Sequence, residues 1–217
     1  TLNTLDSLDG GDGIDTLNFT YNTAVTPLSI ANIENITITD ADAATETLNF
    51  VNVTGLTSLT SIASQAAVDV NNLTAIPTIK LQNQAVNVDL DFVNTVVSGS
   101  DDTITLEVSG NTDGDVTIEG VETVNLVSSG TANTLDVNDT GTTLTTINIS
   151  GDTAVTLNDT TALEAEVTTV NASNATGNVT LGANATPLTA AVHTLTGGSG
   201  NDTFVLGGTY IGGATGA

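Results

Sequence analysis

Two glycine-rich nonapeptides near the two ends of the chain contain the residues best suited to chemistry. Residues 10–18 read GGDGIDTLN and residues 197–205 read GGSGNDTFV. Both follow the pattern G-G-x-G-x-D-x-U-x, in which U is a large apolar residue. Glycine adopts backbone conformations that are closed to other residues, so the carbonyl oxygens of such a turn can converge with the aspartate carboxylate. Converging oxygen atoms suit a hard cation, and the pattern is typical of calcium-binding parallel β-rolls.

A degenerate third copy precedes the first nonapeptide in the same nine-residue phase. Residues 1–9 read TLNTLDSLD and place Asp6 and Leu8 in the aspartate and apolar positions. The apolar residue two positions after each aspartate is expected to point into the core. We expect Asp6 to share the first site only if its degenerate repeat is stacked against residues 10–18.

These motifs resemble those of the RTX (repeats-in-toxin) calcium-binding proteins, which are exported by type I secretion. The resemblance is closest to bacterial surface-layer proteins and large adhesins of that group, and the remaining sequence is similar in texture, rich in Thr, Asn, Val, Leu, Gly and Asp. It implies an extracellular, calcium-dependent protein at the bacterial cell surface, in a group with many non-enzymatic members. It also implies the metal ligands, with carboxylates from Asp15 and Asp202 and backbone carbonyls from Gly10, Asp12, Gly197 and Ser199.

The charge of the chain restricts its partners. Its 217 residues include 25 Asp and Glu but a single Lys and no Arg, which gives a formal net charge of −24. Such a chain repels nucleic acid and anionic membranes, whereas cations are its natural partners. Asp is more frequent than Glu, and because Asp is a turn and ligand residue, the acidity indicates turn and ion chemistry. Solubility or adaptation to salt is the alternative.

Other sequence features bear on compartment and length. No Cys is present, so neither disulfide bonds nor a thiolate metal site can hold the fold. No run of about 18 apolar residues could span a bilayer, and no cleavable signal pattern occurs, so we expect no membrane insertion. Residues 1–9 already lie inside a repeat, and residues 212–217 (GGATGA) read like a glycine-rich turn without its aspartate. We therefore expect a piece of a longer polypeptide, with its secretion signal elsewhere.

The pattern of apolar residues predicts an all-β protein. Thr, Val and Ile dominate short alternating runs such as residues 86–90, and Asn, Asp and Gly separate these runs. A related phrase recurs as VETVNL, LTTINI and VTTVN, and it advances from Val124 to Ile147 to Val170 in two steps of 23 residues. A repeat of this length cannot bury its apolar face alone and is stabilised by stacking on its neighbours.

We therefore predict a parallel β-solenoid of roughly ten rungs, about 45 to 50 Å long, with Thr and Asn ladders on its outside. An antiparallel β-sandwich is the alternative, although no Asn-Gly pair or two-residue hairpin turn separates the strand runs. We predict a short helix or a wider loop at residues 60–70 and 160–166. The expected division is 1–18 as calcium-binding repeats, 19–195 as solenoid, and 196–217 as a calcium-binding turn and the start of a further repeat.

Three further groups of carboxylates are weaker candidates. Residues 97–104 (VSGSDDTI) align Asp102 with Asp202 but lack the paired glycines. A structural turn is therefore favoured there over a decayed calcium turn. Two Asp-x-Asp pairs are interpreted as solvated turn residues, with a contribution to a cation site as the alternative: Asp40 with Asp42, and Asp113 with Asp115.

Catalytic residues are scarce. His193 and Lys80 are the only residues of their kinds, whereas a hydrolytic triad needs a base beside a nucleophile. We interpret His193 as a rung residue beside the last turn. Polysaccharide lyases and epimerases on parallel β-helices rely on Arg, Lys, His or Tyr, which here leaves those two residues with Tyr21 and Tyr210. Paired carboxylates could hydrolyse glycosides, but aromatic residues that would stack on sugars form only 3% of the chain.

From these observations we expect a non-catalytic structural module of a secreted, calcium-dependent surface-layer or filament protein that associates with other copies of itself. Calcium outside the cell would neutralise the acidic turns and drive folding. One alternative is an RTX adhesin segment that extends or binds at a distance, with cell-surface polysaccharide as a partner. The alternative from another class is a polysaccharide-modifying β-helix module.

Overall fold

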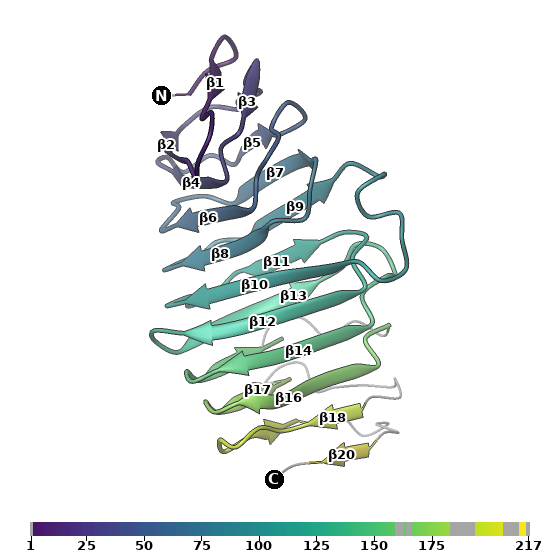
Figure 1. The fold of residues 1–217 in the computed structure, drawn as a ribbon. Coiled ribbons are helices and arrows are strands. Elements are labelled where there is room, and N and C mark those ends of the chain that lie inside the picture. The colour runs from purple at the N-terminus through teal and green to yellow at the C-terminus, as the bar shows by residue number, and fades with distance from the viewer. Residues whose placement is uncertain (1, 159–162, 164–165, 183–193, 206–212, 216–217) are drawn as a thin grey trace.

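The computed structural model describes residues 2–158, 163, 166–182, 194–205 and 213–215. Within these residues every regular element is a β-strand, and the strands pair in parallel from one end of the molecule to the other. Figure 1 shows the strands stacked above one another between the two termini. The predicted parallel β-solenoid is therefore confirmed, and the antiparallel β-sandwich is excluded. No helix in the described part of the chain is long and apolar enough to cross a membrane.

Two long sheets form the walls of the solenoid, and a small third sheet lies near the N-terminus. The ten-stranded sheet contains, in spatial order, β2 (Thr16–Tyr21), β4 (Asn35–Asp40), β6 (Ser58–Ile62), β8 (Thr78–Gln82), β10 (Thr103–Ser109), β12 (Thr123–Ser129), β14 (Thr146–Gly151), β16 (Thr169–Ala175), β18 (Thr194–Thr196) and β20 (Gly213–Thr215). The eight-stranded sheet contains β5 (Glu46–Asn49), β7 (Val68–Leu73), β9 (Val88–Phe92), β11 (Asp115–Ile118), β13 (Asn133–Asn138), β15 (Val155–Leu157), β17 (Val179–Leu181) and β19 (Thr203–Phe204). The small sheet pairs β1 (Ser7–Asp9) with β3 (Ser29–Ala31). Each full circuit of the chain around the solenoid is called a coil. The eight strands in the shorter wall of the described chain correspond to about eight coils, rather than the roughly ten rungs predicted.

The register of the strands confirms the repeat read from the sequence. Val124 pairs with Ile147, and Ile147 pairs with Val170, so the 23-residue step is the rise from one coil to the next. Other coils differ in length, since the steps in the ten-stranded sheet run from 19 residues between β2 and β4 to 27 residues between β8 and β10. The longest coil includes the wide excursion between β9 and β10 in Figure 1. The turns therefore set the length of each repeat, while the inward and outward positions of the strands stay aligned from coil to coil.

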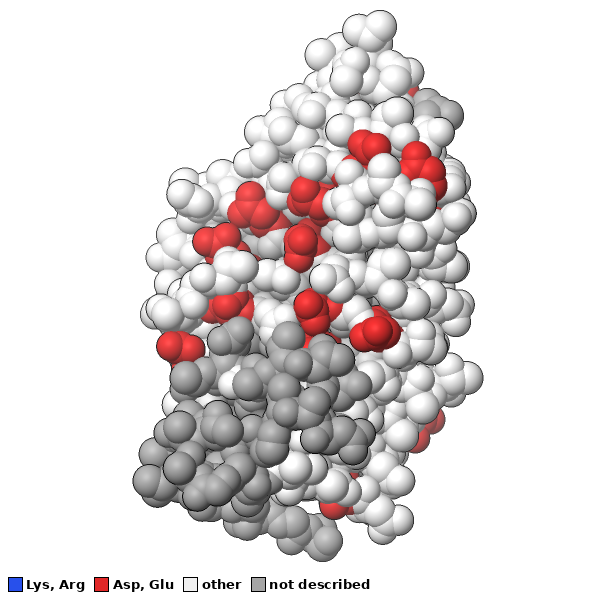
Figure 2. Space-filling model, turned by 180° about the vertical axis from the view of Figure 1, so that it is seen from behind, with Lys and Arg blue, Asp and Glu red and all other residues white. Residues whose placement is uncertain are grey.

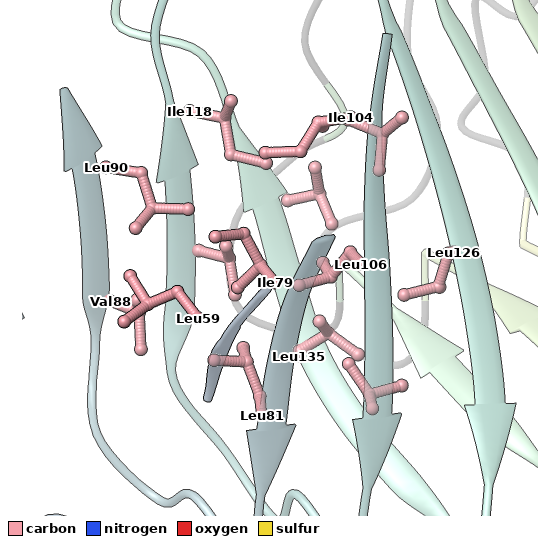
Figure 3. Close-up of a cluster of buried hydrophobic side chains, with 14 of the residues drawn as sticks. Leu59, Ile79, Leu81, Val88, Leu90, Ile104, Leu106, Ile118, Leu126 and Leu135 are labelled. Atoms are coloured by element: carbon pink, nitrogen blue, oxygen red, sulfur yellow. The ribbon is translucent and has the colours of Figure 1, made fainter. Parts of the chain in front are cut away.

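Aliphatic side chains from both sheets fill the interior. In β4, Ile36 and Ile38 are fully buried while Thr37 between them is half-exposed, as the alternation of side chains along a strand requires. Burying one such side chain stabilises the fold by about 1.5–3 kcal/mol. The same cluster continues from coil to coil, and Figure 3 shows its central part, with Leu59, Ile79, Leu81, Val88, Leu90, Ile104, Leu106, Ile118, Leu126 and Leu135 labelled.

Several local predictions have different outcomes. Between β6 and β7 the chain makes a turn in which Ala63 has a φ of 46°, so the short helix considered for residues 60–70 is wrong. Residues 213–215 form a strand, β20, beside β18, as the start of a further repeat requires, whereas the remaining residues of the predicted glycine-rich turn at 212–217 lie outside the described residues. Residues 160–166 lie mostly outside the described residues, and His193 and Tyr210 lie outside them entirely.

The predicted outer ladders are present on the ten-stranded sheet. Asn125, Asn148 and Asn171 occupy one register column in consecutive coils. The Asn148 side-chain amide donates a hydrogen bond to Oδ1 of Asn125 at 2.9 Å. The ladder therefore joins neighbouring coils on the solvent side, as the outward Asn positions predicted.

Candidate calcium-binding turns

The first glycine-rich turn lies directly before β2, at a corner of the ten-stranded sheet. Gly11 and Gly13 have φ values of 82° and 127°, a region that favours glycine. Gly10 is required for another reason, because a Cβ atom there would lie 2.0 Å from the carbonyl oxygen of Asn32 and 2.8 Å from Oδ2 of Asp15. The turn is therefore pressed against the next coil, and the carboxylate of Asp15 folds back over Gly10.

The backbone of Asp15 is hydrogen-bonded to the next coil, whereas one oxygen atom of its carboxylate has no hydrogen-bond partner. Its N–H donates to Oε2 of Glu34 at 2.8 Å, and its carbonyl oxygen accepts the N–H of Asn35 at 3.1 Å. Its Oδ2 atom is buried without a hydrogen-bond partner. A buried carboxylate oxygen without a donor is costly, and a bound cation would offset that cost. The residues of the first turn therefore fit the cation that the motif predicts.

Asp9 also positions this turn, although it was not among the predicted ligands. Its Oδ1 atom accepts hydrogen bonds from the Asn32 side chain at 2.8 Å and from the Gly11 N–H at 3.0 Å. These bonds, the Asn32 bond first, lower the pKa of Asp9. The sequence signal was available, because an aspartate directly before two glycines commonly accepts the N–H two residues ahead. Asp12, which was predicted to offer its carbonyl, is exposed.

Asp6 lies in a different part of the N-terminal coils. Its carboxylate accepts hydrogen bonds from the backbone and side chain of Asn3, and its carbonyl oxygen accepts the N–H groups of Leu28 and Ser29. The strand that follows it, β1, pairs with β3. The degenerate repeat thus pairs with β3, and the contribution of Asp6 to the first site stays a prediction.

The last turn, residues 197–202, lies before β19 and so at the edge of the opposite wall. Asp202 accepts the N–H of Val179 at 2.9 Å with Oδ1 and the N–H of Gly198 at 2.7 Å with Oδ2. A Cβ atom on Gly197 would lie 2.5 Å from Oδ2 of Asp202, and one on Gly198 would lie 2.2 Å from the carbonyl oxygen of Ala175. Asp202 therefore already joins two coils through N–H donors, and each carboxylate oxygen keeps a lone pair for a cation.

The N–H of Ser199 in the same turn donates to the Ala175 carbonyl oxygen at 3.0 Å. Ser199 was predicted to offer its own carbonyl oxygen to the metal. This bond occupies only its N–H group, so the predicted role of the carbonyl is unaffected.

The turn at residues 97–102 is the structural counterpart of the first turn. The N–H of Asp102 donates to Oε2 of Glu122 at 2.8 Å, and the carbonyl of Asp102 accepts the N–H of Thr123 at 3.1 Å. Asp15 makes the same two backbone contacts with Glu34 and Asn35. The sequence alignment paired Asp102 with Asp202, but Asp102 directly precedes β10 of the ten-stranded sheet, whereas Asp202 directly precedes β19 of the eight-stranded sheet. Oδ2 of Asp102 also accepts the Gly99 N–H at 3.1 Å, consistent with the structural turn that was favoured.

Acidic side chains collect on the wall opposite the ten-stranded sheet (Figure 2). Asp115 of β11 and Asp136 of β13 are register partners, and burial, followed by Asp136, raises the pKa of Asp115. Two shallow hollows of about 160 and 340 Å³ also open on this wall, and Asp91 and Glu119 line both. The single cationic side chain, Lys80, pairs with Glu107 at 3.1 Å on the other wall.

The two Asp-x-Asp pairs differ in burial. Asp113 is exposed and accepts the N–H of Gly114, as expected of a solvated turn residue. Asp115 and Asp42 are half-buried. Asp40 is fully buried, so its interpretation as a solvated turn residue is wrong. It occupies the same face of β4 as Ile36 and Ile38, which points it into the solenoid.

No three carboxylates or imidazoles in the described residues lie close enough to hold a metal ion through side chains alone. A turn site would therefore depend on one carboxylate with backbone carbonyl oxygens, which is the kind of ligand set that the motif implies. Comparison of the chain with protein-family models, with curated proteins and with solved structures returns no match. Calcium binding stays a prediction, which depends on the motif and on the unpartnered oxygen of Asp15.

Proposed function

We propose that this chain is a non-catalytic, calcium-stabilised structural module of a secreted bacterial surface-layer or filament protein. The observation that carries the proposal is the parallel stack of strands, in which β2 and β20 are the outermost of the described strands of the ten-stranded sheet. An outermost strand presents unpaired backbone donors and acceptors, which favour pairing with a further strand of the same direction. Copies joined head to tail in this way form a filament or one line of a lattice.

The N-terminal coil offers apolar surface for such pairing. Leu17 and Phe19 in β2 are only partly buried, whereas their register partners Ile36 and Ile38 are fully buried. Ile14, in the turn before β2, is 82% exposed. A coil stacked on this end would bury these side chains in the same way as the interior coils bury theirs. The preferred partner is therefore another coil of the same kind, and in this proposal a second copy of the chain supplies it.

Calcium links folding and assembly in this proposal. A chain of net charge −24 repels itself, both between its own turns and between copies. Ions bound at the glycine-rich turns would reduce that repulsion, and they would stabilise the folded state because they bind it and not the unfolded chain. In this scheme low calcium keeps the chain unfolded for export, and extracellular calcium folds it.

Light scattering coupled to gel filtration tests the proposal. We expect a monomer in chelator and larger species as calcium rises to millimolar levels, with magnesium at matched ionic strength as the control for screening. The Asp15→Asn variant should need more calcium for the same association. A chain that circular dichroism shows to be folded, and that stays monomeric in millimolar calcium, would contradict the assembly part of the proposal.

A second candidate, a module that binds or modifies cell-surface polysaccharide, is favoured by the acidic hollows on the eight-stranded wall. Asp91 and Glu119 line both hollows, and paired carboxylates are the groups that hydrolyse glycosides. Release of reducing ends from bacterial polysaccharides, and its loss in Glu119→Gln, would favour this candidate. Absence of both binding and release would leave the structural module.

A further inference from the structure

Oxygen-bearing side chains point into the solenoid at the corner where the chain passes from β4 to β5. Tyr21 ends β2 and Asp40 ends β4, and the two are register partners with 1% and 0% exposure. Glu46 begins β5 and lies on the same face of this strand as the buried Leu48, because alternate side chains share a face. Three polar groups from neighbouring strands thus occupy inward positions at this corner, and in the next coil the register partner of Glu46 is the aliphatic Val68.

Two of these groups have buried oxygen atoms without partners. Neither Oδ2 of Asp40 nor the hydroxyl of Tyr21 has a hydrogen-bond partner, although Oδ1 of Asp40 accepts the Asp42 N–H at 3.2 Å. Burying an ionised carboxylate is costly unless it is paired. The chain has one cationic Lys and no Arg, and Lys80 is paired with Glu107. No Lys or Arg of this protein therefore neutralises Asp40.

The electrostatic surroundings of the corner are negative. Burial, followed by Asp42 and Glu46 among the charged groups, raises the pKa of Asp40. Burial, followed by Asp40, Asp69 and Glu46, raises the pKa of Tyr21. Several carboxylates lie near one another at this corner, and the side chains offer only oxygen atoms as metal ligands. Such an environment favours a hard cation.

We propose that this corner binds a calcium-sized cation between the carboxylates of Asp40 and Glu46 and the hydroxyl of Tyr21. Backbone carbonyl oxygens and water would supply the remaining ligands, since calcium takes six to eight. The ion would join β2, β4 and β5, and so fasten the first coils to one another. The site is separate from the glycine-rich turns, and it does not depend on the proposed function or on assembly.

Terbium luminescence offers a specific test, because a bound Tb³⁺ ion replaces calcium and emits when a nearby tyrosine is excited. The chain has no Trp and only two Tyr residues, Tyr21 and Tyr210. We expect sensitised emission from the wild-type chain, suppression of that emission by added calcium, and retention in Tyr210→Phe. Emission should be lost in Tyr21→Phe, which removes the sensitiser.

Variants of the two carboxylates separate this site from the first turn. Asp40→Asn and Glu46→Gln keep the shape of the side chains and should weaken terbium binding at least about 10-fold. Asp15→Asn is the matched control, because Asp15 is six residues before Tyr21 along an extended strand, about 20 Å away, and its ion would not be sensitised well. Circular dichroism of each variant establishes that it is folded.

The outcomes decide between a bound cation and a buried Asp40 that is protonated. Emission that depends on Tyr21 and Asp40 supports the proposal. Absence of Tyr21-dependent emission from the folded wild-type chain, or unchanged binding in both Asp40→Asn and Glu46→Gln, would overturn it. If the stability of the Asp15→Asn variant follows pH through Asp40 and does not change with calcium or terbium, Asp40 is a buried acid without an ion, and the proposal fails.

Discussion

A row of buried polar side chains predicts how strongly one coil depends on the next. Ser64, Gln84, Asn111 and Asn133 lie at successive corners after the strands of the ten-stranded sheet, and each accepts the backbone N–H of the polar residue one coil earlier. The bonds are Asp40 N–H to Ser64 Oγ at 3.1 Å, Ser64 N–H to Gln84 Oε1 at 3.0 Å, Gln84 N–H to Asn111 Oδ1 at 2.9 Å and Asn111 N–H to Asn133 Oδ1 at 3.0 Å. We call these four residues the inner polar row.

Replacing Asn133 by alanine should destabilise the chain by about 2–4 kcal/mol. Asn133 is 1% exposed, and it accepts the Asn111 N–H and donates to Oγ of Ser128 at 2.9 Å. Without it the Asn111 N–H is buried without a partner, which costs about 1–3 kcal/mol, and the hydrogen bond to Ser128 is worth about 1 kcal/mol more. Asn148→Ala is the matched control, because Asn148 makes its ladder bond to Asn125 on the half-exposed outside, where water can replace it.

Urea unfolding followed by circular dichroism measures the two losses in the same background. Since stacked coils can open in parts, hydrogen exchange at the Asn111 amide should accompany the unfolding curves. We expect Asn133→Ala to speed that exchange, and Asn148→Ala to cost less than about 1 kcal/mol and leave it unchanged. Equal losses in the two variants would refute the argument that the inner polar row joins the coils.

Two further predictions concern the turns and the acidic wall. A Cβ atom on Gly151 would lie 2.0 Å from a backbone oxygen of the previous coil, so Gly151→Ala should lower the free energy of unfolding in urea by more than about 3 kcal/mol. A Cβ atom on Gly11 would lie in open space, and the positive φ of this residue is the only obstacle to alanine. Gly11→Ala should therefore cost about 1–2 kcal/mol. Burial and Asp136 raise the pKa of Asp115 above its unfolded value, so the stability that Asp115 contributes is fully present below that value and is lost as pH rises through the folded pKa. Asp115→Asn should therefore make the fall in unfolding free energy above about pH 4 less steep, and an unchanged slope in unfolding measured across this range would contradict the assignment.

The amino-acid sequence alone determined the class of fold and part of its register. Alternation of apolar with Thr and Asn residues requires strands with one buried face, and the 23-residue step aligned Val124 with Ile147 and Val170. Parallel stacking follows from such a repeat, because each coil buries its apolar face only against its neighbours. The same periodicity predicted the outer Asn ladder.

Only the tertiary structure decided where each turn lies. Coils of the ten-stranded sheet advance by 19 to 27 residues, so spacing in the sequence does not tell which corner a given turn occupies. This is why Asp102 matches Asp15 in its contacts but was aligned with Asp202, and why Asp6 stacks on β3. Turn length is weakly constrained by local sequence, whereas strand phase is fixed by burial.

The burial of Asp40 likewise depended on the tertiary structure. In sequence, Asp40 and Asp42 look like a solvated pair in a turn rich in alanine. In the solenoid Asp40 is the last inward position of β4, directly beside Tyr21 in the previous coil, and the next coil covers it through Ser64. Whether a polar residue at the end of a strand faces water or the interior depends on the coils on both sides of it, which only stacking brings together.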